Sequence, residues 1–482
     1  MKRWWKRPAA KASESPALAS LMQQTAEASE SRMTANASQT APEQETMSQP
    51  ITAFLQTVCE QIRTKKAHRS VRRELEGHIA DLVEELMAEG MERQEAERVA
   101  VARMGDARDI GRQLNEVHKP VIEWGLIGIV ATMLGLGLFY MYVLDLRMGT
   151  SFTNTDLFAD QVLFAVIGII LAGAIWLYDY RSLARKSWLL YALAVVLMLY
   201  TAFLAPAMNG SRVFIALPFG SIHAMMAVMF LLIVSNASVT SVREWTFQRT
   251  GAELLARVVV PIVFFAATNA FVLLALYLSS SLVQLWILRI SWQQKLVTTA
   301  SGLSAMTLLA LLKPYHLERF LSQIFPSAEG ENFVVSLLSA HIKEAGWFGN
   351  GPVALDERLA GLHSEGLFSV MIHTYGWLMG IGFSALVLTF IVRAAIIGSK
   401  VRDPFGKLLI AGLVSIMGLQ FVWSILMSLG WAPFAGVSMP LVSYGGNSML
   451  LHMLAIGLIL SVAKQQRVSS GERSSSLVGK RA

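Results

Sequence analysis

The chain contains a succession of apolar runs, each about long enough to cross a lipid bilayer, and the first begins at Val121. A membrane-spanning helix needs about 20 predominantly apolar residues. Backbone groups in lipid must be hydrogen-bonded within the segment, so such runs form helices. Hydrophobic residues make up 54% of the chain and charged residues only 16%, which excludes an ordinary soluble domain. The sequence therefore predicts an all-α polytopic membrane protein.

The apolar runs predict about ten transmembrane helices. The single spans centre on 121–144, 161–179, 187–206, 221–237, 296–312, 367–392, 408–429 and 441–463. The region 254–290 is too long for one ordinary span, and basic residues flank it on both sides, with Arg249 before it and Lys295 after it. Because basic loops tend to stay in the cytoplasm, an even number of passes must lie between them. We predict two short helices around Ala270.

The charges of the remaining loops predict the orientation of the chain. Arg181, Lys400 and Lys464 belong to basic segments that are expected on the cytoplasmic side, which places both the N- and the C-terminus in the cytoplasm. The longest external loop runs from Lys313 to about Gly366, just before the eighth helix. Loops of that length are uncommon in compact proteins and are often functional. We therefore expect functional residues in this loop.

The first 120 residues differ from the rest of the chain. Residues 1–50 lack hydrophobic periodicity and any signal peptide, and they are predicted to be disordered. Residues 51–118 place apolar side chains at helical spacing and predict a small cytoplasmic helical domain. The membrane domain is expected over 121–465, and a cytoplasmic tail over 466–482. The single cysteine, Cys59, excludes an intramolecular disulfide.

The helical domain has a recognisable pattern of its own. Residues 74–90 read EL-x-x-HI-x-D-x-x-x-EL-x-x-x-G, and residues 100–106 read A-x-x-x-MGD. This pattern resembles the small prefix domain found ahead of assorted bacterial membrane permeases. The resemblance implies a docking or regulatory role, and the alternative is a folded domain with no ligand of its own.

Three motifs follow one another along the membrane region. Residues 209–212 read NGSR in an external loop. The long loop contains GWFGNG at residues 346–351 and HSEGLF at residues 363–368. The last apolar run opens with VSYGG at residues 442–446. Adjacent glycines at a helix start allow close backbone approach and leave the helix N-terminus open to an anionic group.

Together these motifs resemble the SEDS family (shape, elongation, division and sporulation), which comprises FtsW-, RodA- and SpoVE-like membrane proteins. The resemblance covers roughly residues 121–465. It implies a peptidoglycan glycosyltransferase of the bacterial inner membrane that polymerises lipid II, with polyprenyl pyrophosphate as the leaving group. A class B penicillin-binding protein transpeptidase is the implied protein partner, in addition to membrane lipids. No nucleic acid is expected.

The resemblance also assigns roles to individual residues. The family carries an essential Asp in an H-T-D motif, and the matching residue here is Glu365, which would take the proton from the acceptor sugar hydroxyl. Cationic groups are expected to balance charge on the departing pyrophosphate, and a divalent cation beside Glu365 could assist them. No spacing typical of a protein metal site occurs. The expected substrate-binding residues are Arg212, Arg319, Lys313, His363, Ser443, Tyr444, Gly445 and Gly446.

The chain departs from the family pattern at several positions. Glu365 replaces the family Asp, and Phe214 stands where a Trp usually follows the N-G-x-R segment. Residues 222–226 read IHAMM where the family carries Q-P-S-E, and His373 and Thr374 stand where it carries acidic residues. These departures favour an alternative, a non-catalytic homologue that scaffolds or regulates a cell-wall complex. A transporter would show paired intramembrane charges and an internal repeat, and the spans contain neither.

Overall fold

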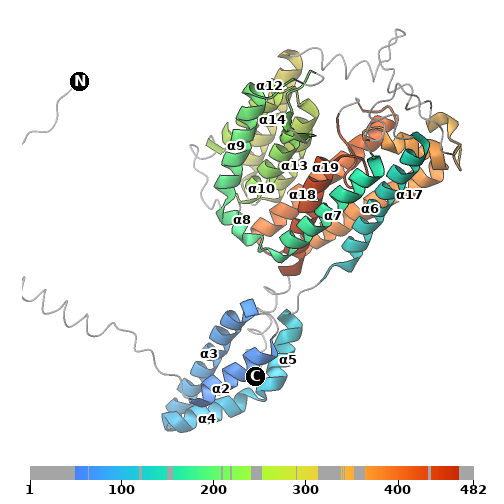
Figure 1. Ribbon diagram of the computed structural model, residues 1–482. Coiled ribbons are helices and arrows are strands. Elements are labelled where there is room, and N and C mark those ends of the chain that lie inside the picture. Colours follow the sequence, from blue (N-terminus) through green and yellow to red (C-terminus); the bar gives the residue numbers. More distant parts are fainter. Residues whose placement is uncertain are drawn as a thin grey trace, which may run out of the picture. The chain divides into compact units, whose positions relative to one another are not determined.

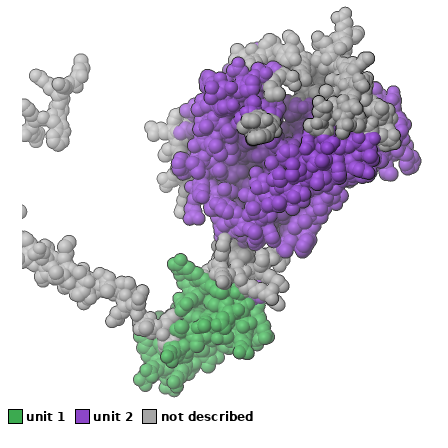
Figure 2. Space-filling model, in the orientation of Figure 1, with its two compact units in different colours: residues 1–113 green, residues 114–482 purple. Residues whose placement is uncertain are grey.

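The computed structural model describes two compact units of the chain, one within residues 1–113 and one within residues 114–482 (Figure 2). The described residues are 49–62, 65–118, 122–148, 156–207, 210–217, 220–239, 252–253, 255–288, 290–312, 338, 340, 342–351, 364–432 and 436–465. The disorder predicted for the N-terminal segment and the tail predicted after residue 465 therefore fall almost entirely outside the described residues.

Unit 1 is built from short amphipathic helices around a small apolar core. The helices are α2 (Gln49–Gln61), α3 (Lys65–Ala88), α4 (Arg93–Met104) and α5 (Ala107–His118), the last of which crosses the unit boundary. Val58, Leu86 and Ala96 are fully buried between them. A Cβ atom at Gly111 would lie 2.6 Å from Cβ of Gln61, so α5 packs directly on the end of α2. The helices predicted from the spacing of apolar residues are present.

Unit 2 is a bundle of mostly apolar helices (Figure 1). Its described helices are α6 (Trp124–Met148), α7 (Leu157–Leu177), α8 (Arg181–Arg185), α9 (Ser187–Phe203), α10 (Ala224–Ala237), η1 (Leu255–Val259), α12 (Val260–Ala267), α13 (Phe271–Ile287), α14 (Trp292–Leu312), α17 (Leu367–Lys400), α18 (Pro404–Ser428) and α19 (Gly446–Gln465). Five of these, α6, α7, α17, α18 and α19, are long and apolar enough to cross a membrane. Helices α9, α10 and α13 and the η1–α12 segment are apolar but shorter. The structure is therefore mostly helical with five candidate membrane spans, and it also contains a short β-hairpin that the all-α prediction did not include.

The long apolar region 254–290 is interrupted where the sequence predicted it. Ala270 is the N-cap of α13, and α12 ends three residues earlier. Asn269 adopts a left-handed φ of 58°, a conformation that Asn tolerates better than most residues. Its Nδ2 donates a hydrogen bond to the carbonyl of Gly210 at 2.8 Å, which ties this turn to the preceding loop. The prediction of two short helices is confirmed.

A short antiparallel hairpin precedes α10. Strand β1 (Phe214–Leu217) pairs with β2 (Gly220–His223), with Phe214 opposite His223. The His223 ring also caps α10, because its Nδ1 accepts a hydrogen bond from the backbone N–H of Met226 at 3.2 Å. The apolar run predicted to begin at residue 221 therefore starts as a strand and becomes helical at Ala224. We call the end of unit 2 that carries β1 and β2 the hairpin end.

Small residues let the central helices approach closely. Helices α7 and α19 lie side by side along their lengths (Figure 1). A Cβ atom at Gly457 would lie 2.7 Å from the carbonyl oxygen of Ala172, and one at Gly168 would lie 2.8 Å from Cγ of Met453. Such close contacts are typical of membrane helix pairs, where packing rather than water exclusion drives association. Gly168 and Gly457 therefore allow α7 and α19 to pack closely at two points along their contact.

Candidate active site

The VSYGG motif lies in a closed turn at the hairpin end. We call residues 436–446, which lead into α19 and include its first residue, the signature loop. The hydroxyl oxygen of Ser443 accepts a hydrogen bond from the backbone N–H of Met439 at 3.0 Å. The hydroxyl groups of Ser438 and Ser448 lie 3.1 Å apart and form a second hydrogen bond across the loop. These bonds hold the loop in one conformation.

Glu365 lies directly beside the signature loop. A Cβ atom built at Gly436 would be 3.4 Å from Oε1 of Glu365, an ordinary van der Waals distance, so the carboxylate lies against this part of the loop. The Glu365 side chain is half-buried, and Gly366 immediately after it is the N-cap of α17. The structure thus brings together the residue predicted as the base and the loop predicted to meet the substrate.

Two polar residues of α7 anchor the signature loop. Nε2 of Gln161 donates a hydrogen bond to the carbonyl of Ser443 at 3.2 Å. The hydroxyl of Tyr444 donates to Oδ2 of Asp160 at 3.0 Å. Sequence reasoning did not predict either contact, because neither Asp160 nor Gln161 belongs to one of the three motifs. The sequence did contain a signal for these contacts. Asp160 and Gln161 are adjacent polar residues near the start of an apolar helix, where polar side chains need hydrogen-bonding partners.

Glycines seat the loop against the neighbouring helices. A Cβ atom at Gly137 of α6 would lie 2.7 Å from the carbonyl oxygen of Val442. A Cβ atom at Gly446 would collide with the Phe164 ring of α7. The two predicted motif glycines therefore differ in role. Gly446 is required by close packing, and Gly445 by its φ of 151°, a conformation that other residues rarely adopt.

The helix that follows Glu365 is broken near its start. Gly376 has φ 81° and ψ 178°, which interrupts the helical path of α17. The sequence predicted a single uninterrupted run over 367–392, since glycine in an apolar run does not by itself indicate a break. The nine residues from Leu367 to Tyr375 therefore form a separate short helical segment. This segment carries Glu365 at its N-terminal side.

The GWFGNG motif binds the backbone exposed by this break. The N–H groups of Asn350 and Gly351 donate to the carbonyls of His373 and Thr374, at 2.9 and 3.1 Å. In the opposite direction, the N–H of Trp377 donates to the carbonyl of Gly346 at 3.1 Å. Backbone groups freed by a helix break in a membrane protein must find such partners. The motif predicted from the long loop is thus a structural brace for the segment after Glu365.

A buried polar chain extends from the signature loop into the bundle. Nδ1 of His452 lies 3.2 Å from the hydroxyl of Ser448, and its Nε2 lies 2.7 Å from Oε1 of Gln420. His452 and Gln420 are almost completely buried. Each buried ring nitrogen therefore has a partner, which is the usual arrangement for a polar group inside a membrane protein. No sequence motif indicated this series of hydrogen bonds.

Arg212 is held at a different part of the hairpin end. Its backbone N–H donates to the carbonyl of Thr268 at 3.1 Å, and its Nη1 donates to the carbonyl of Ala202 at 3.1 Å. The residue is exposed. These contacts place Arg212 between the end of α9 and the turn between α12 and α13.

The other predicted site residues divide between described and undescribed parts of the chain. Lys313, Arg319 and His363 lie outside the described residues. Ser443 is buried, and Tyr444 is half-buried. Within the described ranges, no group of three or more His, Cys, Asp or Glu side chains is arranged to hold a metal ion. The described part of the site therefore consists of the Glu365 side chain, the signature loop, and Asp160 and Gln161 of α7, which anchor the loop.

The chain resembles known bacterial membrane proteins in sequence. It is 26% identical over 378 residues to the probable peptidoglycan glycosyltransferase FtsW of Thioalkalivibrio sp., covering 73% of this chain and 92% of that protein. It is 23% identical over 427 residues to the peptidoglycan glycosyltransferase RodA of Treponema pallidum, covering 70% of this chain and 97% of that protein.

Solved structures show the same fold. A chain from a peptidoglycan synthase complex that coordinates polymerization and crosslinking superimposes with a TM-score of 0.59 at 21% identity, covering 72% of this chain and 98% of that chain. The rod shape determining protein RodA of Thermus thermophilus superimposes with a TM-score of 0.53 at 19% identity, with the same coverage. The family model of FtsW, RodA and SpoVE, described as a cell cycle protein, matches residues 124–468. The chain is therefore a member of the FtsW/RodA/SpoVE family.

Proposed function

We propose that the protein is a peptidoglycan glycosyltransferase that polymerises lipid II at the hairpin end of unit 2. The observation that carries this proposal is the position of the Glu365 carboxylate beside Gly436 of the signature loop. Relatives that share 92% to 97% of their length with this chain carry the name peptidoglycan glycosyltransferase. The reaction needs a carboxylate at the place where an acceptor hydroxyl and a lipid-linked donor meet.

Glu365 is the general base in this proposal. Its carboxylate accepts the proton from the acceptor sugar hydroxyl as that oxygen attacks the anomeric carbon of the donor. The new glycosidic C–O bond forms while the bond between the anomeric carbon and the pyrophosphate oxygen breaks. Polyprenyl pyrophosphate leaves with the electron pair. Arg212, Arg319 and Lys313 are the cations proposed to balance its charge.

The signature loop supports this chemistry by fixing the geometry. Hydrogen bonds from Tyr444 to Asp160 and from Gln161 to the carbonyl of Ser443 fix the position of the loop beside Glu365. The GWFGNG brace holds the short helical segment that follows Glu365. A displacement of about 1 Å in a tightly positioned catalytic group costs about 10²-fold in rate. These contacts would therefore affect turnover by positioning the loop, in addition to the substrate contacts proposed for Ser443, Tyr444, Gly445 and Gly446.

The proposal includes a topology. Helices α6, α7, α9, α10, α12, α13, α14, α17, α18 and α19 are taken as ten spans of the bacterial cytoplasmic membrane. The basic loops then face the cytoplasm, with both termini, and the hairpin end faces outward. A lipid-linked substrate in the outer leaflet reaches Glu365 from that side. A class B penicillin-binding protein transpeptidase is the proposed partner, and unit 1 is proposed to be a cytoplasmic docking or regulatory domain.

A non-catalytic scaffold is the second candidate function. The observations that favour it are the replacement of the family Asp by Glu365 and the replacement of Q-P-S-E by residues 222–226. In the structure, residues 222 and 223 belong to the strand that precedes α10, with His223 capping that helix. A scaffold would keep the fold and the partner contacts and lose glycan synthesis.

The test that separates the two functions is glycan synthesis by the purified full chain. The protein is incubated with lipid II, alone and with candidate class B transpeptidases, and glycan strands are resolved by gel electrophoresis. A family polymerase with known activity is the positive control in the same membranes. Strands made by this chain support the glycosyltransferase. Their absence under every partner condition, with an active control, supports the scaffold.

A further inference from the structure

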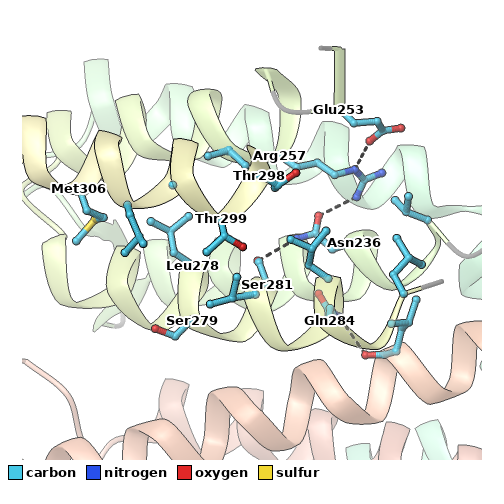
Figure 3. Close-up of a pocket in the computed structure, with 18 of the residues that line it drawn as sticks. Asn236, Glu253, Arg257, Leu278, Ser279, Ser281, Gln284, Thr298, Thr299 and Met306 are labelled. Carbon is cyan, nitrogen blue, oxygen red and sulfur yellow. Dashed lines mark hydrogen bonds and ion pairs between the residues drawn. The ribbon is translucent and has the colours of Figure 1, made fainter. Parts of the chain in front are cut away.

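A cavity lies in unit 2, away from the signature loop. It has a volume of about 360 Å³ and is bounded by α10, η1, α13 and α14 (Figure 3). Its lining includes Asn236 in the last turn of α10 and Leu288 just after α13. Both positions are at the helix ends opposite the hairpin end. Pockets of about 300 to 1,000 Å³ are the usual size for small-molecule ligands.

The walls of the cavity are apolar and elongated. They are formed largely by Val258, Leu278, Leu282, Leu285, Leu303 and Met306. On α14 the lining runs from Thr298 to Met306, which corresponds to about 12 Å along the helix axis. Leu303 is 65% exposed, and so the cavity opens on the apolar outer surface of the bundle. An aliphatic chain from the surrounding bilayer fits such a slot.

One end of the cavity carries a paired positive and negative charge (Figure 3). Nε of Arg257 donates to Oε2 of Glu253, and its Nη1 donates to Oδ1 of Asn236 at 2.8 Å. The hydroxyl of Tyr277 donates to the backbone carbonyl of Arg257 at 2.7 Å. The side chains of Arg257 and Glu253 are 23% and 24% exposed, so they are held in place yet reachable. A rigid carboxylate and guanidinium side by side complement a group that bears both charges.

We propose that this cavity binds a phospholipid with a zwitterionic aminoethyl phosphate head group, that is, a phosphatidylethanolamine. One acyl chain lies along the apolar wall between α13 and α14. The primary ammonium donates hydrogen bonds to Glu253, and the phosphate accepts from Arg257. A choline head group has no N–H to donate to Glu253. A phosphoglycerol head group brings a net negative charge without a cation for that carboxylate.

Gly302 offers a clean way to fill the cavity. It lines the cavity on α14, and a Cβ atom built on it meets nothing within 4 Å. Gly302→Phe should therefore add bulk at the cavity wall, starting from a Cβ position with open space around it. Gly173→Phe is the matched control, because Gly173 on α7 also has open space around its Cβ and does not line the cavity.

The experiment is native mass spectrometry of the delipidated full chain titrated with phosphatidylethanolamine, phosphatidylcholine or phosphatidylglycerol of identical acyl chains. The wild-type protein and Gly173→Phe should retain phosphatidylethanolamine preferentially. Gly302→Phe should lower its retention about tenfold, and Glu253→Gln should remove the preference over phosphatidylcholine. Equal retention of the three lipids by the wild type, a preference for phosphatidylglycerol, or unchanged binding in Gly302→Phe would each overturn the proposal. The readout is lipid retention, so the result does not depend on glycosyltransferase activity.

Discussion

The backbones of Gly349 and Gly376 pack so closely that neither residue can carry a side chain. A Cβ atom on Gly349 would lie 2.6 Å from the backbone nitrogen of Gly376, and one on Gly376 would lie 2.5 Å from the nitrogen of Gly349. Both residues also have positive φ values, 79° and 81°. This contact joins the long loop to the break in α17. It therefore fixes the short helical segment that begins next to Glu365.

Gly376→Ala should destabilise the protein strongly. The new methyl group would enter the backbone of Trp347 and Gly349, and Ala does not tolerate the backbone conformation of Gly376. The expected loss is about 3 kcal/mol, measured as a lower melting temperature of the purified protein in detergent. Gly382→Ala is the control, because Gly382 lies in the regular part of α17 with nothing within 4 Å of its Cβ position. Equal melting temperatures for the two variants would contradict the conclusion that the GWFGNG motif braces the break in α17.

Tyr444→Phe should loosen the signature loop. The variant removes the hydrogen bond to Asp160 and should cost about 1 kcal/mol of stability. Glycan synthesis should fall about tenfold, because the loop beside Glu365 is less well positioned. Tyr142→Phe on α6, where the side chain is 47% exposed, should leave both properties unchanged. If Tyr444→Phe polymerised lipid II at the wild-type rate, the contact with Asp160 would have no role in positioning.

Tyr180 should make the stability of unit 2 sensitive to alkaline pH. Burial, with the nearby Asp403 carboxylate, raises the pKa of the Tyr180 phenol to about 12, and the hydroxyl donates to Oδ2 of Asp403 at 3.0 Å. Below about pH 10 the phenol is neutral in both the folded and the unfolded chain, so its full contribution to the free energy of unfolding is present there. As pH rises from about 10 through 12, up to about 3 kcal/mol of that stability is lost, because only the unfolded chain releases the proton.

The measurement is the melting temperature between pH 9 and pH 12. Tyr180→Phe should flatten the alkaline part of this profile, since Phe has no proton to lose. The neighbouring Tyr178 is 41% exposed, so Tyr178→Phe should keep the wild-type decline. If the melting temperature of Tyr180→Phe fell as steeply with pH as that of the wild type, another group would be responsible for the loss of stability at alkaline pH.

The sequence predicts the helical framework well because apolar length and flanking charge determine it. The run from 254 to 290 is an example, since the basic residues around it required two passes and the structure places a turn at Ala270. The break at Gly376 could not be predicted in the same way. It depends on the close packing of Gly376 against Gly349 of the preceding loop, and glycine occurs in many unbroken membrane helices.

The candidate site was predictable only in part. The family resemblance assigns Glu365 and the signature loop to one site, but only the structure shows that the carboxylate lies beside Gly436. The pairing of Tyr444 with Asp160 joins residues 284 positions apart, and only the packing of α7 on α19 brings them together. The cavity beside Arg257 likewise depends on the packing of α10, η1, α13, α14 and α18, and no motif marks the residues that line it. Local patterns predict helices, whereas such contacts are properties of the assembled bundle.

The most direct test of the account is the rate of glycan synthesis from lipid II by Glu365→Gln and Glu344→Gln. Glu344 is an exposed carboxylate of the same long loop, so its variant controls for the loss of one charge. We expect Glu365→Gln to lose about 10²- to 10⁴-fold in turnover, as removal of a general base does, while Glu344→Gln keeps the wild-type rate. Both variants should retain the wild-type melting temperature. Turnover of Glu365→Gln equal to that of Glu344→Gln would show that Glu365 is not the base.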